Sequence, residues 1–288
     1  MSKSVLVTGC SSGFGLETAV ALSRRDWRVF AALRDPSRRG DLDAALAAAN
    51  APAGAVTVVR MDMADPKSIA TGAEQVLEAA GGTLDALVNN AGLTVGGYLE
   101  DLSIEDYRKS FEVNFFGLVE LTRLMVGPMR EHGGGRIVVV SSNIVNIPMP
   151  VLAPYAASKW ALEGWAEVSA MELTPFGIDL LVVQPGAHRT ALGNNTQLTM
   201  PADSLYADRM GTIFAGLGQI GSEAGPPERV GVHIANLLEA RRPAFRTQVG
   251  NDAKRAAERK STTPYTVRER EVRKLTGLSA PDRANSST

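Results

Sequence analysis

Short apolar runs rich in β-branched residues alternate with helix-favouring stretches from the first residues of the chain. Runs of this kind lie at 5–7, 29–33, 56–61, 84–88, 137–140, 178–183 and 245–249, and each is too short for a helix. Alternating strands and helices predict a parallel sheet with helices on both faces, and right-handed crossovers leave few topologies besides the doubly wound one. The expected fold is a single α/β domain with a mostly parallel, seven-stranded sheet.

Residues 187–227 interrupt this alternation. The segment is rich in Gly, Ser and Pro, and a loop of this length in a compact domain is usually functional. We therefore expect a Rossmann-type catalytic domain over residues 1–250, with a substrate lid at 187–227. An extra helix that packs on the core is an equally good explanation for the apolar residues at helical spacing, which are Leu205, Tyr206, Met210, Ile213, Phe214 and Leu217.

The end of the chain is basic and polar, which predicts a solvated helical tail over 251–288 with disorder from 279 onward. Over the whole chain, 30 Lys and Arg residues nearly balance 31 Asp and Glu residues, so nothing indicates a nucleic-acid partner. No apolar run reaches the length of a membrane span. Cys10 is the only cysteine, which fits a reducing compartment. The first strand begins by Ser4 and leaves no room for a signal peptide, so we expect a cytoplasmic protein.

A glycine-rich turn, TGCSSGFG at 8–15, follows the first strand directly. Gly9, Gly13 and Gly15 permit a tight turn in which backbone N–H groups approach a pyrophosphate at the start of a helix. Their spacing, G-xxx-G-x-G, differs from the usual G-x-G-x-x-G dinucleotide motif. We expect a dinucleotide phosphate site here, with Ser11, Ser12 and Phe14 in the same turn.

The residues after the second strand indicate which dinucleotide binds. An NAD site favours a carboxylate at this point, but the chain offers Arg34, which can meet a 2′-phosphate with help from Ser12. We therefore favour NADP(H). Asp35 follows one residue later and leaves NAD(H) open, while Arg38 and Arg39 are either further phosphate partners or exposed charges. Asp62, just past the third strand, either accepts from the adenine amine or caps a helix.

Tyr155 and Lys159 lie four residues apart at the start of a long predicted helix, so that they share one face. A phenol titrates near pH ~10, and a nearby ammonium lowers its pKa. A lowering of about three units corresponds to roughly 4 kcal/mol. A serine at the end of the preceding strand, Ser141 or Ser142, could hold the oxygen of a carbonyl. Together these groups form a proton donor for a ketone that accepts a hydride.

Two asparagine positions complete the candidate site. Asn89, Ala91 and Gly92 belong to the run NNAG that closes the fourth strand beside the expected cofactor crevice. Asn114 lies in a long helical region, 104–130, on an otherwise apolar face. A buried amide needs partners, so Asn114 either holds a water on a proton path to Lys159 or is a satisfied structural amide.

These motifs, in this order, resemble the short-chain dehydrogenase/reductase family over roughly residues 3–190, and within it the branch of 17-beta-hydroxysteroid and retinol dehydrogenases. The resemblance implies that Tyr155 is the general acid/base and that Lys159 lowers its pKa and holds the ribose. It also implies that Ser142 orients the substrate and that Asn114 carries a water relay. Pro185, Gly186 and Thr190, from the run PGAHRT, would fix the nicotinamide. The family further implies a homodimer or homotetramer.

The combined prediction is an NADP-dependent enzyme that interconverts a ketone and a secondary alcohol on a small hydrophobic substrate such as a steroid, retinoid or aryl ketone. One alternative is a catalytically silent NADP-sensing regulator with the same fold, although such a sensor needs only the glycine turn. Another is an epimerase or dehydratase, which shares the Tyr–Lys spacing but not this glycine spacing or length.

Overall fold

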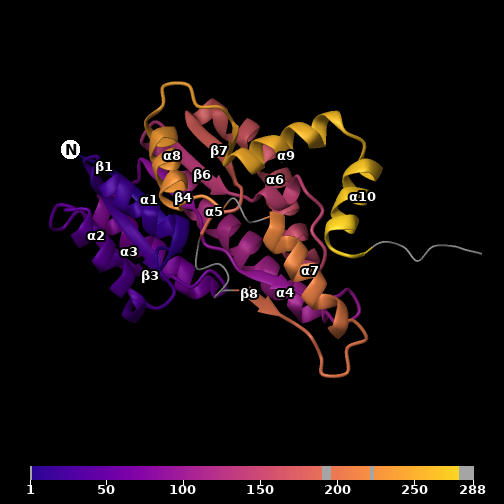
Figure 1. The fold of residues 1–288 in the computed structure, drawn as a ribbon. Coiled ribbons are helices and arrows are strands. Elements are labelled where there is room, and N and C mark those ends of the chain that lie inside the picture. The colour runs from indigo at the N-terminus through magenta and orange to yellow at the C-terminus, as the bar shows by residue number, and fades with distance from the viewer. Residues whose placement is uncertain (1, 190–195, 221–223, 279–288) are drawn as a thin grey trace, which may run out of the picture.

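The computed structural model describes residues 2–189, 196–220 and 224–278. Its main sheet has seven strands in the order β3-β2-β1-β4-β6-β7-β9, and every neighbouring pair is parallel. This confirms the predicted doubly wound fold (Figure 1). The strands are β1 (Lys3–Thr8), β2 (Trp27–Leu33), β3 (Val56–Arg60), β4 (Ala86–Asn89), β6 (Gly135–Val140), β7 (Ile178–Pro185) and β9 (Arg246–Val249).

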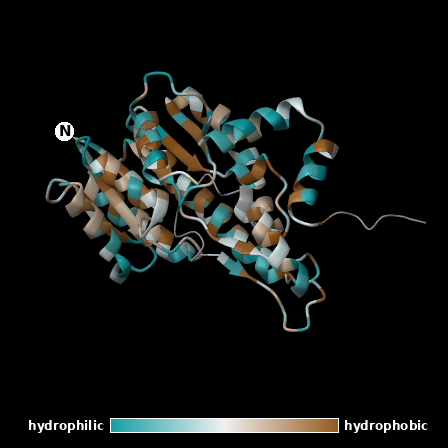
Figure 2. Ribbon diagram, viewed as in Figure 1, coloured by the Kyte–Doolittle hydropathy of each residue, from teal (hydrophilic) through white to brown (hydrophobic). Residues whose placement is uncertain are grey.

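Alternation along the strands divides the core into two layers, one on each face of the sheet. Val5 and Val7 of β1 pack with α1 (Gly13–Ser23), α2 (Gly40–Ala48) and α8 (Glu228–Glu239). Leu6, between them, packs on the other face with α3 (Pro66–Ala80), α5 (Gly117–Glu131) and α6 (Ala153–Leu173). Figure 2 shows the hydrophobic residues concentrated on the central strands. Because both faces are covered, central strands such as β4 and β6 are nearly continuous apolar runs rather than alternating with polar residues.

The predicted long helix at 104–130 is interrupted. It begins as α4 (Ile104–Phe111), passes through a π-helical turn (Glu112–Phe116), and continues as α5. Asn114 lies in this turn, and such π turns often occur at functional sites.

Two short strands lie apart from the main sheet. β5 (Thr94–Gly96) pairs in parallel with β8 (Thr196–Leu198). Helix α7 (Ala207–Ile220) follows and buries Met210 and Ile213 against Val151. Four residues of the predicted apolar stripe therefore lie in a helix that packs on the domain, whereas Leu205 and Tyr206 precede it.

The chain ends in α9 (Asn251–Thr262) and α10 (Tyr265–Leu275), which Figure 1 shows at the end of the molecule far from β1. Ala253, Ala256 and Val272 are buried, and Arg268 donates to the Asn146 carbonyl oxygen at 3.1 Å. These helices therefore pack against the domain on an apolar side. Residues 279–288, where disorder is expected, lie outside the described part. Within the described part, no helix is both long enough and apolar enough to cross a bilayer.

Candidate active site

The turn after β1 comes very close to the loop after β4, at the point where strand order reverses and doubly wound sheets bind ligands. Gly9 and Gly13 have φ values of +73° and +58°, which favour glycine. A Cβ on Gly15 would lie 2.5 Å from Nδ2 of Asn90 and would overlap the Gly9 carbonyl. Ser12, the N-cap of α1, makes no side-chain hydrogen bond to the helix. Ser12 thus leaves the first N–H groups of α1 to an external anion.

Thr8 and Asn90 tie the two strand ends together. The Thr8 hydroxyl accepts from the N–H groups of Asn90 at 2.9 Å and Ala91 at 3.0 Å, and the Asn90 amide donates to the Thr8 carbonyl at 2.9 Å. Sequence reasoning singled out Asn89 instead. Its side chain is buried on the opposite side of β4 and donates to Thr122 at 2.8 Å. Successive residues of a strand face opposite ways, so Asn90 faces the crevice and Asn89 does not.

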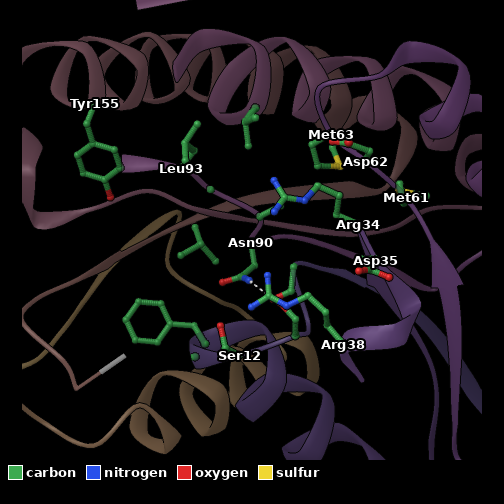
Figure 3. A pocket seen from close by; sticks show the side chains of 18 of the residues that line it. Ser12, Arg34, Asp35, Arg38, Met61, Asp62, Met63, Asn90, Leu93 and Tyr155 are labelled. Carbon is green, nitrogen blue, oxygen red and sulfur yellow. Dashed lines mark hydrogen bonds between the residues drawn. The ribbon is translucent and has the colours of Figure 1, made fainter. Parts of the chain in front are cut away.

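One cavity, here called the glycine-turn cavity, extends from this turn to Tyr155 (Figure 3). Residues from the ends of β1, β2, β3, β4 and β6 meet around it. The predicted site residues that line it are Gly9, Ser11, Ser12, Gly13, Phe14, Arg34, Asp62, Ala91, Gly92, Tyr155 and Lys159. Gly15 does not line the cavity and instead lies against the Gly9 carbonyl and the Asn90 side chain.

The end of the glycine-turn cavity beyond β2 carries two arginines. Arg34 and Arg38 both line it together with Ser12, and Figure 3 shows both guanidinium groups turned toward Asn90. Asp35 also lines it, but its Oδ1 accepts from the backbone N–H and the hydroxyl of Ser37 at 3.0 and 2.7 Å. These hydrogen bonds lower the Asp35 pKa. Arg39 lies elsewhere and pairs with Asp43.

Asp62 also lines this cavity, after β3. Its Oδ1 accepts from the Ala64 N–H at 3.0 Å. The cap of α3 is supplied by Asp65, whose carboxylate accepts from the Lys67 N–H at 2.9 Å. Asp62 therefore does not cap α3, and the explanation of Asp62 as a helix cap is wrong. Its contact with the adenine amine stays a prediction.

At the other end of the cavity, Tyr155 and Lys159 share one face of α6, as their spacing predicts. The Lys159 ammonium is buried and donates to the Val140 carbonyl oxygen at 2.9 Å. It lies 5.9 Å from the centre of the Tyr155 ring. The end of β6 thus fixes the amine beside the phenol without a direct hydrogen bond between the two.

The pKa values of this pair depend mainly on burial. Burial lowers the pKa of Lys159 to about 8, and the nearby Glu163 carboxylate opposes that shift. Burial raises the pKa of Tyr155, and a hydrogen bond with Ser142 opposes that rise. The sequence-based expectation assigned the lowering of the Tyr155 pKa to Lys159. In this structure the Tyr155 pKa is raised by burial, and the group that opposes the rise is Ser142 rather than Lys159.

Ser142 and Ser141 separate at the end of β6. Ser141 lines the glycine-turn cavity, whereas Ser142 lines a second cavity, here called the α7 cavity, beside helix α7. Pro185 and Gly186, which are expected to fix the nicotinamide, line the α7 cavity and not the glycine-turn cavity, together with Phe214 and Leu217 of α7. Among the described residues that line the two cavities, Tyr155 alone lines both. Thr190 lies outside the described residues.

Asn114 is fully buried behind the glycine-turn cavity. Its Oδ1 accepts from the Leu93 N–H at 2.8 Å, and its Nδ2 donates to the Leu93 carbonyl at 2.8 Å and to the Ser158 hydroxyl at 2.9 Å. The side chain therefore has the partners of a structural amide. It fixes Leu93, which lines the cavity, and Ser158, which neighbours Lys159 on α6.

The residues of the glycine-turn cavity fit a dinucleotide. Glycine backbone and the start of α1 suit a pyrophosphate, and the two arginines suit a further phosphate. Gly9 also faces the loop after β4, where a Cβ would lie 2.9 Å from the Ala91 Cα. Glycine thus keeps the backbone close enough to the crevice for direct contact with a ligand.

Comparisons with known proteins identify the family of the chain. A sequence profile described as short chain dehydrogenase matches residues 3–200. The uncharacterized oxidoreductase YusZ of Bacillus subtilis is 37% identical over 239 residues, which cover 82% of this chain and 84% of that protein. Human 17-beta-hydroxysteroid dehydrogenase type 1 is 35% identical over 251 residues, which cover 84% and 76%.

The likeness to a solved structure extends through the C-terminal helices. The crystal structure of a short-chain dehydrogenase from Streptomyces avermitilis superposes with a TM-score of 0.79 at 31% identity, covering 98% of this chain and 99% of that one. The profile match, the relatives and the shared fold lead to one conclusion. The chain belongs to the short-chain dehydrogenase family and is an oxidoreductase that acts on CH–OH groups.

Proposed function

We propose that the protein is an NADP-dependent enzyme that interconverts a ketone and a secondary alcohol on a hydrophobic substrate of the steroid, retinoid or aryl ketone kind. The observation that supports this best is the position of Tyr155, which lines both the glycine-turn cavity and the α7 cavity. A phenol at that junction can exchange a proton with a substrate in one cavity while the cofactor occupies the other.

Each residue of the site has a separate role in this reaction. The bound nicotinamide supplies or accepts the hydride. Tyr155 gives a proton to the carbonyl oxygen, or takes it from the alcohol. Ser142, which lines the α7 cavity together with Tyr155, holds the same oxygen. Lys159 holds the ribose, and Asn114 fixes Leu93 and Ser158 behind the site. Proton transfer alone typically accelerates a reaction by roughly 10²–10⁴-fold. Holding the substrate and the cofactor in position accelerates it further.

The preference for NADP rests on Arg34 and Ser12, with Arg38 beside them. An arginine can bind a 2′-phosphate through paired, charge-assisted hydrogen bonds. The competing carboxylate, Asp35, already accepts two hydrogen bonds from Ser37 on one oxygen. The position of Arg34 and Arg38 in the cavity therefore supports NADP(H) over NAD(H).

The apolar part of the substrate would lie against α7. Ile144, Met149, Leu152 and Leu198 line the α7 cavity together with Phe214 and Leu217. We propose that residues 187–227 act as a lid over this substrate. Helix α7 carries both the residues that line the cavity and the residues that pack on Val151, so it can couple closure to substrate contact.

We also propose a homodimer or homotetramer packed through α4–α5 and α6. Large apolar side chains on these helices remain exposed, among them Phe116 at 51%, Val168 at 52% and Met171 at 69%. These exposed apolar side chains are the support for association through these helices. A cytoplasmic location stays a prediction from the single cysteine.

The test is a panel of ketones and secondary alcohols, measured at the nicotinamide absorbance with NADPH and NADH. The wild type should reduce an apolar ketone with NADPH, and Tyr155→Phe should lose nearly all turnover while it binds NADPH as the wild type does. Equal turnover by the two proteins would exclude the proposed role of Tyr155. NADPH binding without turnover of any panel member by the wild type would favour the sensor instead.

A further inference from the structure

An acidic residue from the C-terminal segment enters the α7 cavity. Asp252 lies in the first turn of α9, and it lines the cavity together with Tyr155 and Ser142. Sequence reasoning placed it in a solvated tail. The contact arises because β9 adds to the sheet beside β7, so that the segment after β9 emerges next to Gly186, which follows β7.

The backbone around Asp252 is shaped to receive the carboxylate. Its Oδ2 accepts from the Ala187 N–H at 2.7 Å. A Cβ on Gly250 would lie 2.5 Å from Oδ1, and a Cβ on Gly186 would overlap the carboxylate. Gly250 also has a φ of +109°, which disfavours other residues. Two glycines and one N–H group therefore hold the carboxylate at the edge of the cavity.

This carboxylate gives the cavity its charge. Among the described residues that line the α7 cavity, Asp252 is the one acidic or basic side chain. The remaining lining is apolar or neutral, and the buried Thr94 hydroxyl has no hydrogen-bond partner in the described part of the protein. An ionised carboxylate only accepts hydrogen bonds. A substrate group placed against it must donate one, and an anionic group is repelled.

We infer that Asp252 selects substrates that carry a hydrogen-bond donor, a hydroxyl or an ammonium group, in addition to the reacting ketone or alcohol carbon. This inference rests on the proposed function, because it assigns the substrate of that same reaction. Asp252 is a specificity residue in this assignment: it contacts the substrate away from the reacting carbon and takes no part in proton transfer.

Four matched aryl ketones test this assignment: an unsubstituted parent and analogues with a hydroxyl, an amine or a carboxylate at the far end of one short chain. The measurement is kcat/KM with NADPH. The wild type should prefer the hydroxyl and amine analogues over the parent by roughly 10- to 100-fold, since hydrogen bonds to charged groups are the strong ones. It should disfavour the carboxylate analogue.

Asp252→Asn keeps an oxygen that can accept from Ala187 but removes the charge. We expect it to lose most of the preference for the amine and most of the discrimination against the carboxylate. Asp41→Asn is the matched control, because Asp41 is an exposed aspartate in the first turn of another helix, α2, and lines neither cavity. It should behave as the wild type, and melting curves should show that both variants are folded.

The outcomes separate this inference from the proposed function. If the wild type reduces the parent ketone but favours neither donor analogue, the assignment of Asp252 is overturned and the proposed reaction stands. An Asp252→Asn variant with wild-type preferences overturns the assignment in the same way. If the wild type reduces none of the four ketones, the proposed function fails and the assignment fails with it. Should Asp252→Asn not fold, the preferences of the wild type alone decide.

Discussion

The Lys159 ammonium lies 5.9 Å from the centre of the Tyr155 ring, and the Val140 carbonyl oxygen accepts its hydrogen bond at 2.9 Å. The amine is therefore held by the end of β6 while it faces the same cavity as the phenol. Burial disfavours the charged form of the Lys159 amine, so the folded protein is less stable when this group is protonated. The same effect lowers the pKa of Lys159 to about 8.

Lys159→Met should therefore raise the free energy of unfolding at pH 7 while it abolishes turnover. The lysine pKa is 10.5 in a model compound and about 8 in the folded protein. Between these values the unfolded chain binds more protons, so wild-type stability rises with pH from about 8 to 10.5. At 1.36 kcal/mol per pKa unit the cost is at most about 3 kcal/mol. Leaving the Val140 carbonyl unpaired offsets about 1 kcal/mol of the gain.

Urea denaturation at several pH values measures this effect. The advantage of Lys159→Met should be about 1–2 kcal/mol at pH 7 and should disappear as pH approaches 10.5. Lys67→Met, an exposed position in α3, is the control and should change stability by less than about 0.5 kcal/mol at pH 7. A Lys159→Met protein that is less stable than the wild type at pH 7 would contradict the expectation.

Arg34→Ala should reduce the preference for NADPH over NADH by about 10- to 100-fold, because it removes a charge-assisted contact to the 2′-phosphate. The ratio of kcat/KM values for the two cofactors measures the effect. Arg39→Ala is the matched control, since Arg39 bonds to Asp43 at 2.7 and 2.9 Å instead of lining the cavity. If both variants discriminate as the wild type does, the assignment of Arg34 is wrong.

Much of the fold follows from local sequence pattern. Each strand-and-helix unit carries its own signal, so the seven strands and their parallel arrangement were predictable. The π-helical turn at Glu112–Phe116 was not predictable, because nothing in a single apolar helical pattern marks an inserted residue. It becomes intelligible only from the contacts of Asn114 with Leu93 and Ser158.

In the site, too, some residues carry a local sequence signal and others depend on contacts between distant segments. Glycine spacing and the Tyr155–Lys159 interval carry local signals, and the structure brings these residues to one cavity. Strand alternation at the end of β4 could have identified Asn90 in place of Asn89. Asp252 could not have been found in this way, because its contact with Ala187 joins segments 65 residues apart. Such contacts depend on which strand lies beside β7, and composition alone assigns the segment to solvent.

Asn114→Ala should lower the free energy of unfolding by about 2–4 kcal/mol. The change removes an acceptor and a donor from Leu93 at a buried position, and each buried polar group left unpaired costs roughly 1–3 kcal/mol. NADPH affinity should fall as well, because Leu93 lines the cavity. Urea denaturation and NADPH titration measure the two effects.

The control for this change is Asn251→Ala, at an exposed position at the start of α9. It should alter stability by less than about 0.5 kcal/mol. A stable Asn114→Ala protein with undiminished NADPH affinity would show that the amide is dispensable for the loop after β4.

Gly15→Ala tests the closeness of the turn to the loop after β4. The new methyl group would lie 2.5 Å from the Asn90 amide nitrogen and would overlap the Gly9 carbonyl, so the turn must move away from its ligand-binding position. We expect NADPH affinity to fall at least about tenfold and stability to fall by about 1–3 kcal/mol, the usual cost of overpacking. Gly211→Ala, on an exposed turn of α7 with no atom within 4 Å of the added carbon, should instead hold or raise stability by up to about 1 kcal/mol. Fluorescence titration with NADPH and thermal melting of both variants distinguish the two outcomes, and equal behaviour of the pair would mean that the glycine turn tolerates a side chain at position 15.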